Sequence, residues 1–353
     1  MDRYEIPESR RKDVGDAIEA LHASKRVILT THVNADGDGA GCEAALLSYL
    51  GSRGAEAWIV NPTPFPSHLR FMVDEQHRIL DVLGGDARER CTDADLCVIV
   101  DTGERSRIGQ VGPMVAHLPT LIVDHHPSVP GSVKGPSLVD TGAAAAGELV
   151  FDLLWSENGP WTQSVLDGLY VALMTDTGSF RFSNVTASVH RVVAELIDRG
   201  ASPDGLYRAV YGRVPLRRVR LLREVLPTLA VSSGGGVAWM SVRRGLLRTL
   251  GCNGDDLEGM VDYPRELDSV EVGLLFRELE GAQVKVSFRS NGVVDVNALA
   301  REFGGGGHVR ASGAVVLGSL EDVRGRVVAR VLAAAGEEDP EVEPSARTSE
   351  PQG

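Results

Sequence analysis

The apolar residues in the first half of the chain gather in short runs separated by longer mixed segments. Four runs have the length and the branched side chains of buried strands, and they lie at 27–31, 57–60, 96–100 and 121–123. The segments between them are long enough for crossover helices. Helical apolar spacing is found at 38–50, 143–155 and 165–174. This alternation predicts an α/β fold with a doubly wound, mainly parallel sheet.

The second half repeats the alternation on a smaller scale. An arginine-rich helical stretch that includes Arg213 leads to strands near 237–242, 270–276 and 284–288, which alternate with helices. The tail has six acidic residues, one basic residue, three prolines and no aromatic residue, which is typical of disorder. We therefore predict four parts: a catalytic domain at 1–190, a helical linker at 191–235, a second, smaller α/β domain that binds substrate at 236–335, and a disordered acidic tail at 336–353.

Composition and charge narrow the class of protein. The chain has 353 residues, 43% of them hydrophobic, as expected for a soluble globular protein with a sizeable core. Its net charge of −13 is opposite in sign to that of a protein that grips long nucleic acid, so we expect no long nucleic acid as a partner, while a short anionic ligand remains possible. The absence of an 18-residue apolar run or a signal-peptide core predicts a cytoplasmic protein without a membrane partner. The four cysteines form no CxxC pair, so we expect free thiols.

Three of the predicted strands are each followed at once by side chains that can bind metal. They are His32, Asp36 and Asp38 after the first strand, Asp101 after the third, and Asp124, His125 and His126 after the fourth. Asp176 lies in a turn-like stretch after a predicted helix and can return to the same edge. Because ligands of open α/β sheets bind beyond the carboxyl ends of the strands, we expect these side chains to converge.

So many carboxylates in one crevice would repel one another and raise their pKa values unless a cation held them ionised. Two or three imidazoles and at least four carboxylates without a thiolate suit Mn²⁺ or a similar metal, and they are enough ligands for two ions. Two adjacent ions can activate water for phosphoester hydrolysis.

Each residue also has an ordinary structural explanation. Asp101 or Asp176 alone is most often a helix cap or a turn residue, 36–39 can form a turn with an N-cap, and 124–126 can be a surface triplet. Their joint occurrence at one edge of the sheet favours the metal site.

A second motif is the glycine-rich stretch at 303–313, between a predicted helix at 296–303 and a predicted strand at 314–317. Its candidate phosphate-binding residues are Gly304, Gly305, Gly306, Gly307, His308 and Ser312. Glycines let backbone N–H groups approach an anion closely, and the two side chains add donors. A flexible linker is the alternative, but the position between a helix and a strand favours phosphate contact. Arg289 can reach the same pocket or be an exposed arginine without a role.

These motifs resemble those of a known family. The sequence reads THVNADGD at 31–38, VD at 100–101, DHH at 124–126 and TDTG at 175–178, which resembles in order and spacing the four motifs of the DHH phosphoesterases. The stretch 304–313 resembles the glycine-rich signature of the DHHA1 domain. The size of the chain and the stretch 284–313 resemble the bacterial nanoRNase and pAp-phosphatase (NrnA-like) branch.

The resemblance implies a substrate and a role for each site residue. Members of this branch hydrolyse very short oligoribonucleotides and often linear dinucleotides or 3′-phosphoadenosine 5′-phosphate (pAp), which makes short oligoribonucleotides or mononucleotide bisphosphates the expected partners. Two Mn²⁺ ions, with Mg²⁺ or Co²⁺ as substitutes, would be bound by His32, Asp36, Asp38, Asp101, His125 and Asp176. Asp101 would be shared between the ions, and Asp124 would orient His125. His126 would act on the scissile phosphate or the leaving group, while Arg289 and His308 would hold the substrate.

The resemblance leaves several questions open. The chain carries Ala35 where many relatives have proline, and Ala40 where many have a bulkier apolar residue, so the shape near the first metal can differ. A cyclic-dinucleotide phosphodiesterase, an inorganic pyrophosphatase and a non-catalytic nucleotide sensor remain alternatives, and the sequence is compatible with a homodimer.

Overall fold

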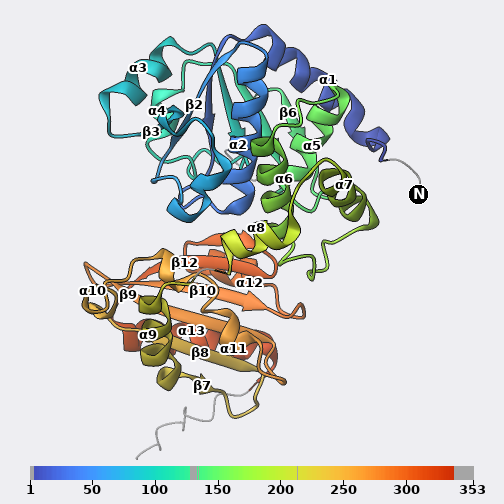
Figure 1. Ribbon diagram of the computed structural model, residues 1–353. Helices are drawn as coiled ribbons and strands as arrows, with labels where there is room; N and C mark the ends of the chain where they lie inside the picture. The colour runs from blue at the N-terminus through green and yellow to red at the C-terminus, as the bar shows by residue number, and fades with distance from the viewer. Residues whose placement is uncertain (1–3, 128–132, 134, 213, 338–353) are drawn as a thin grey trace, which may run out of the picture. The chain divides into compact units, whose positions relative to one another are not determined.

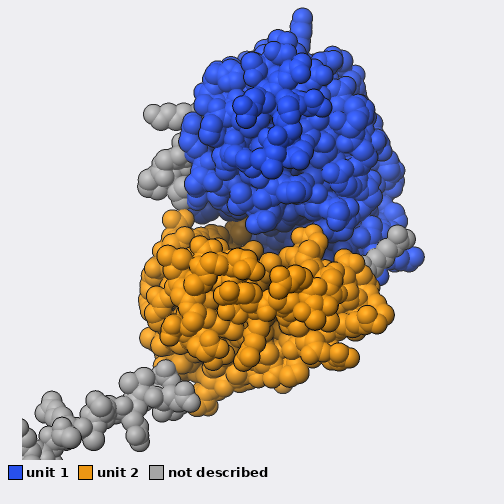
Figure 2. Space-filling view, turned by 90° about the vertical axis from the view of Figure 1, so that its left-hand side faces the viewer, with its two compact units in different colours: residues 1–213 blue, residues 214–353 orange. Residues whose placement is uncertain are grey.

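The computed structural model describes residues 4–127, 133, 135–212 and 214–337 and divides into two units, residues 1–213 and 214–353 (Figure 2). Arg213 of the predicted basic helix and residues 338–353 of the predicted acidic tail lie outside the described residues.

The first unit is built on a parallel sheet of six strands in the order β3-β2-β1-β4-β5-β6 (Figure 1). The strands are β1 (Arg26–Thr30), β2 (Glu56–Asn61), β3 (Ile79–Asp81), β4 (Leu96–Val100), β5 (Thr120–Asp124) and β6 (Ser137–Val139). The doubly wound sheet predicted from the apolar runs is confirmed, with the two short outer strands β3 and β6 added. The order reverses between β1 and β4, which is where such sheets bind ligands.

Helices cover both faces of this sheet. The larger core lies under α1 (Glu8–Ala23), α2 (Gly37–Ser52), α5 (Ala146–Ser156), α6 (Gln163–Asp176), α7 (Ala187–Asp198) and α8 (Pro203–Val210). The opposite face is covered by α3 (Gly85–Asp93) and α4 (Val111–Met114). Side chains alternate along each central strand, so Leu29 enters the larger core and Ile28 the smaller one. Burial of the strands on both faces explains their continuous apolar runs.

Glycines bring α2 and α6 into close contact. A Cβ atom at Gly41 would lie 2.2 Å from the carbonyl oxygen of Gly168, and one at Gly168 would lie 2.5 Å from the carbonyl oxygen of Gly41. At the next contact, a Cβ at Gly37 would collide with the side chain of Thr175. The two helices therefore run antiparallel, and the last turn of α6 lies beside the first turn of α2.

The second unit has a mixed sheet in the order β11-β12-β10-β9-β8-β7. Its strands are β7 (Ala230–Val231), β8 (Val237–Val242), β9 (Val272–Leu279), β10 (Gln283–Ser290), β11 (Gly306–His308) and β12 (Ala311–Leu317). One face packs on α12 (Val296–Glu302) and α13 (Leu320–Ala335), and the other on α9 (Leu216–Val225), α10 (Leu246–Thr249) and α11 (Asp262–Arg265). The expected smaller α/β unit is confirmed. The strand predicted at 314–317 begins earlier because Ser312 and Gly313 already pair with β10.

Two further expectations concern thiols and membranes. All four cysteines are free, as predicted. Among the described residues, no helix has both the length and the apolar character needed to cross a bilayer.

Candidate metal centre

Side chains from four separate segments converge at the carboxyl edge of the parallel sheet. The imidazole Nε2 of His32, after β1, lies 3.1 Å from Oδ2 of Asp101, after β4. Nε2 of His125, after β5, lies 3.5 Å from Oδ1 of Asp101 and 3.3 Å from Oδ2 of Asp176, the last residue of α6. The same nitrogen lies 3.7 Å from Oδ2 of Asp38 in the first turn of α2. Residues up to 144 positions apart thus form one cluster, as the strand-end positions predicted.

Asp101 is the centre of this cluster. Among the described residues of the first unit, three groups of side chains place their ligand atoms within 4.8 Å of one another: His32, Asp36 and Asp101; Asp38, Asp101 and His125; and Asp101, Asp124 and His126. Asp101 belongs to all three. It is 2% exposed and has a φ of +59°, a left-handed conformation that few residues other than glycine adopt. Such conformations concentrate at functional sites, where the surrounding structure holds them.

Backbone carbonyls fix the orientation of two imidazoles. Nδ1 of His32 lies 2.9 Å from the carbonyl oxygen of Val33, and Nδ1 of His125 lies 3.3 Å from that of Ala143. Because a carbonyl can only accept, each Nδ1 carries the proton and each Nε2 is directed at the carboxylates. Histidines that ligate metals are commonly held in this way.

Asp36 and Asp38 each combine a structural role with a place in the cluster. Oδ1 of Asp36 accepts hydrogen bonds from the backbone N–H groups of Asp38 and Gly39 and so caps α2, whereas its Oδ2 lies 3.6 Å from Nε2 of His32. The N-cap expected as the ordinary explanation is therefore present, but it uses only one of the two oxygens.

Asp38 is fully buried and accepts hydrogen bonds from the amides of Ala146 and Gly147, at 2.7 and 2.9 Å. These are the first amides of α5. The N-cap residue of α5 is Ala145, which makes no side-chain capping hydrogen bond, so the carboxylate of Asp38 caps this helix instead. This helix was predicted to begin at 143. It begins three residues later because 143–145 is a separate segment, which supplies the carbonyl that orients His125.

The pKa values of the cluster show how strongly it attracts positive charge. Burial opposes a charged imidazole, but hydrogen bonds to Asp101 and Asp36 outweigh it and raise the pKa of His32 to about 11. The pKa of His125 rises to about 10 because Asp101, Asp38 and Asp176 likewise outweigh burial. Burial and the neighbouring Asp101 raise the pKa of Asp38, and burial raises that of Asp176 to about 7. Protons thus balance the carboxylates when no metal is present, and divalent cations can replace them.

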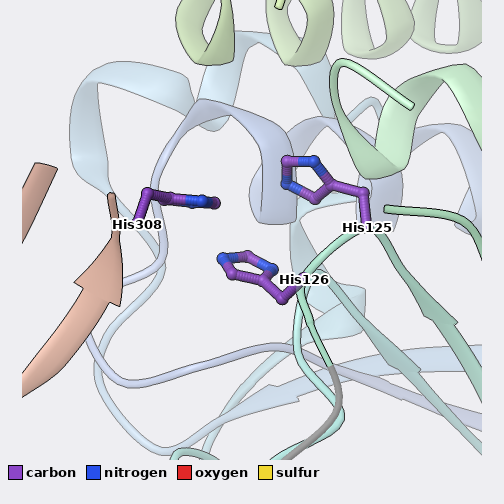
Figure 3. Close-up of side chains that lie close together, drawn as sticks. All are labelled: His125, His126 and His308. Atoms are coloured by element: carbon purple, nitrogen blue, oxygen red, sulfur yellow. The ribbon is translucent and has the colours of Figure 1, made fainter. Parts of the chain in front are cut away.

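Asp124 is hydrogen-bonded to the second histidine of the DHH motif. Its Oδ1 lies 2.7 Å from Nδ1 of His126 and also accepts the backbone N–H of that residue. The resemblance implied that Asp124 orients His125, but the carbonyl of Ala143 has that position. The reason is local: an aspartate side chain readily bonds to the residue two positions on. Figure 3 shows both imidazoles on the segment that follows β5; it also draws His308 of the second unit.

Asn184 supports the site and was not predicted. Its Nδ2 donates to the carbonyl oxygens of Ala144 and Asp176, at 3.0 and 3.1 Å. It thereby ties the segment that orients His125 to the end of α6. Asn184 lies between helices in a stretch without apolar periodicity, so no pattern in the sequence marked it.

The glycines of the second motif have a packing role within the second unit. A Cβ atom at Gly305 would lie 2.0 Å from the carbonyl oxygen of Gly313, and one at Gly307 would lie 2.6 Å from that of Ala311. Only glycine lets this stretch lie so close to β12. Gly304, with a φ of +76°, follows the end of α12, and Gly306 begins β11.

The other predicted substrate residues lie on the same sheet. Arg289 pairs with Ala311 in the register of β10 and β12, and His308 ends β11. Ser312 is buried and donates its hydroxyl to the carbonyl oxygen of His308 at 2.8 Å. Burial lowers the pKa of Arg289, which reflects the cost of desolvating a cation. Ser312 therefore has a structural partner within its own unit, and its contact with phosphate stays a prediction.

The fold and the cluster together define a member of the DHH phosphoesterases. Residues 26–173 match the model of the DHH family, N-terminal domain, and residues 238–337 match that of the DHHA1 domain. The chain belongs to the DHH family, as its motifs indicated.

Individual relatives are similar over most of the chain. It is 33% identical over 330 residues to the bifunctional oligoribonuclease and PAP phosphatase NrnA of Thermus thermophilus, covering 92% of this chain and 93% of that protein. It is 29% identical over 307 residues to the protein of the same name from Bacillus subtilis, covering 85% and 92%. The crystal structure of an exopolyphosphatase-related protein from Bacteroides fragilis is similar with a TM-score of 0.82 and 26% identity, covering 92% of this chain and 96% of that one.

Proposed function

We propose that this protein is a Mn²⁺-dependent phosphoesterase that hydrolyses short oligoribonucleotides, linear dinucleotides such as pApA, and pAp. The observation that carries the proposal is the position of Asp101, a buried carboxylate common to three groups of metal-capable side chains. The relatives named as oligoribonucleases and PAP phosphatases support the substrate class, because they are similar over nearly their whole length.

The ligand atoms divide into two sets around Asp101. His32, Asp36 and Asp101 would hold one ion, and Asp38, Asp101, His125 and Asp176 the other. Two imidazoles and four carboxylates without a thiolate suit Mn²⁺, with Mg²⁺ or Co²⁺ as substitutes. When bound, such ions polarise a phosphoryl oxygen and lower the pKa of a bound water.

The chain's own residues would orient the substrate and handle its protons. Asp124 holds the ring of His126 through Nδ1, and we assign to His126 a contact with the scissile phosphate or a proton donation to the leaving oxygen. The low exposure of Asp38, Asp101 and His125 keeps water away from one side of the cluster and strengthens each charge interaction there.

The second unit would bind the rest of the substrate. We assign this role to Arg289, His308, Ser312 and the backbone N–H groups of residues 304–307. A partly desolvated guanidinium gains by pairing with a phosphate, and glycine leaves the backbone open to a close anion. The net charge of −13 fits a substrate held by a few local donors.

A comparison of substrates tests the proposal. The Mn²⁺-loaded protein is incubated in parallel with pApA, pAp, cyclic di-AMP, a longer RNA and pyrophosphate, with a chelated sample as control, and initial rates are ranked by chromatography. We expect pApA and pAp to be fastest and the chelated sample to be inactive. Fastest turnover of pyrophosphate or cyclic di-AMP would assign the site to a pyrophosphatase or a cyclic-dinucleotide phosphodiesterase. Tight binding of pApA without product would indicate a sensor.

A further inference from the structure

A chain of hydrogen bonds connects a buried carboxyl group outside the metal cluster to the backbone beside the cluster. Glu43, in the second turn of α2, is fully buried, and its Oε2 accepts a hydrogen bond of 2.9 Å from Nδ2 of Asn61 at the end of β2. Oδ1 of Asn61 in turn accepts the backbone N–H of Thr31 at 3.1 Å. All three residues are less than 5% exposed.

Thr31 lies at the carboxyl ends of the central strands β1 and β4, each of which is followed by a candidate metal ligand. The ladder between β1 and β2 extends to Leu29 and Ile59, so the side chain of Asn61 holds the backbone just beyond it. The hydroxyl of Thr31 donates to the carbonyl oxygen of Val100 at 2.9 Å. His32 is the next residue after Thr31, and Asp101 is the next after Val100. The chain from Glu43 therefore ends at the backbone that sets the separation of His32 from Asp101.

The cost of burying Glu43 argues that the group is used. Burial raises its pKa to about 8, and its Oε1 has no hydrogen-bond partner among the described residues. The residues that follow it on α2, Ala44 to Leu46, are buried and apolar. An apolar side chain at 43 would avoid the desolvation cost, but it would leave the amide of Asn61 without its acceptor.

We propose that Glu43 and Asn61 are a positioning pair that sets the geometry of His32 and Asp101 through Thr31. The inference rests on the proposed metal centre, since it concerns how that centre is held. Glu43 touches neither ligand; it acts through the hydrogen bond that fixes which way the amide of Asn61 points.

The test is a Mn²⁺ titration of the full chain, followed by the electron paramagnetic resonance signal of free Mn²⁺. Glu43→Leu removes the acceptor and should weaken Mn²⁺ binding about 10- to 100-fold, as for other groups that orient ligands. Glu43→Gln keeps an oxygen for Nδ2 of Asn61 and should bind Mn²⁺ nearly as well as the wild type. Leu46→Ala is the control for lost stability. Leu46 lies on the same helix and is fully buried in the apolar core, so its replacement should leave Mn²⁺ affinity unchanged.

A reversed pair gives a second, independent readout. Asn61→Asp keeps the acceptor for Thr31 but removes the N–H that donates to Glu43 and leaves two buried carboxyl groups to share one proton, so its Mn²⁺ binding should weaken, relative to the wild type, as the pH rises and that proton is lost. Adding Glu43→Gln supplies an N–H donor toward Asp and should restore most of the affinity. An apolar packing role for position 43 would not produce this recovery.

The outcomes separate the inference from the proposed function. A wild type that binds no Mn²⁺ would overturn the metal centre itself, and this inference with it. A wild type that binds two ions, with Glu43→Leu unchanged or Leu46→Ala equally impaired, would overturn the positioning role alone. Absence of recovery in the reversed pair would also overturn it.

Discussion

Replacing Asp101 by asparagine tests the centre of the proposed site. Its oxygens lie 3.1 Å from Nε2 of His32 and 3.5 Å from Nε2 of His125, and it is common to all three ligand groups of the first unit. Asparagine keeps the volume and removes the charge. It is also a residue that tolerates the φ of +59° found here, whereas alanine there would add backbone strain of about 1 kcal/mol.

The expected loss follows from the number of ions that share this carboxylate. Removing a group that merely orients a ligand typically weakens metal binding about 10- to 100-fold, so losing a shared ligand should cost at least about 100-fold. That factor corresponds to about 3 kcal/mol of binding free energy. The stoichiometry should fall from two Mn²⁺ to one or none, and turnover of pApA should fall by at least the same factor.

Isothermal calorimetry of Mn²⁺ binding and the rate of pApA hydrolysis measure these effects. Asp81→Asn is the matched control, since it alters an exposed aspartate at the end of β3 in the same sheet, outside the cluster. In the metal-free protein, the raised pKa of His32 should also fall in Asp101→Asn, which imidazole NMR signals report. Two ions bound with unchanged affinity in Asp101→Asn would refute the shared-ligand assignment.

Three further predictions use other features of the first unit. Binding of Mn²⁺ at pH 7 should release protons, and the affinity for Mn²⁺ should rise with pH. The reason is that His32 and His125 are doubly protonated below pKa values of about 11 and about 10, and each must lose one proton to bind a metal. Calorimetry in buffers of different ionisation enthalpy measures this release, and a binding enthalpy that is the same in every buffer would contradict it. Gly168→Ala should lower the free energy of unfolding in urea by about 1–3 kcal/mol, since the added Cβ meets a carbonyl oxygen of α2. Gly15→Ala is the control and should not lower this free energy, because the space around Gly15 is open. Equal effects of the two substitutions would contradict the close contact between α2 and α6. Burial raises the pKa of Asp152 in the folded state from 3.8 to about 6, so protonation of this carboxyl stabilises the fold below pH 4, and that contribution, up to about 3 kcal/mol, is lost as the pH rises through 6. The free energies of unfolding in urea of the wild type and of Asp152→Asn should therefore diverge between pH 4 and pH 7. Parallel pH dependences of the two free energies would contradict this prediction.

The sequence alone determined which side chains at the ends of the strands meet at the edge of the sheet. Runs of branched apolar residues mark parallel strands, and parallel strands of one sheet end at a common edge. The positions of His32, Asp101 and His125 directly after such runs were therefore enough to bring them together. The ligand chemistry followed from their types, and the motifs around them pointed to the family.

Tertiary structure decided how the site is completed and held. Asp176 reaches the cluster because Gly41 and Gly168 let two helices touch. The carbonyl of Ala143 orients His125, and the amide of Asn184 ties residue 144 to the end of α6. Apolar periodicity tells which face of an element is buried, but it carries no information about which polar groups pair across elements. Which groups pair depends on differences of a few tenths of an ångström in how closely two backbones approach, and these separations are fixed only when the whole unit packs.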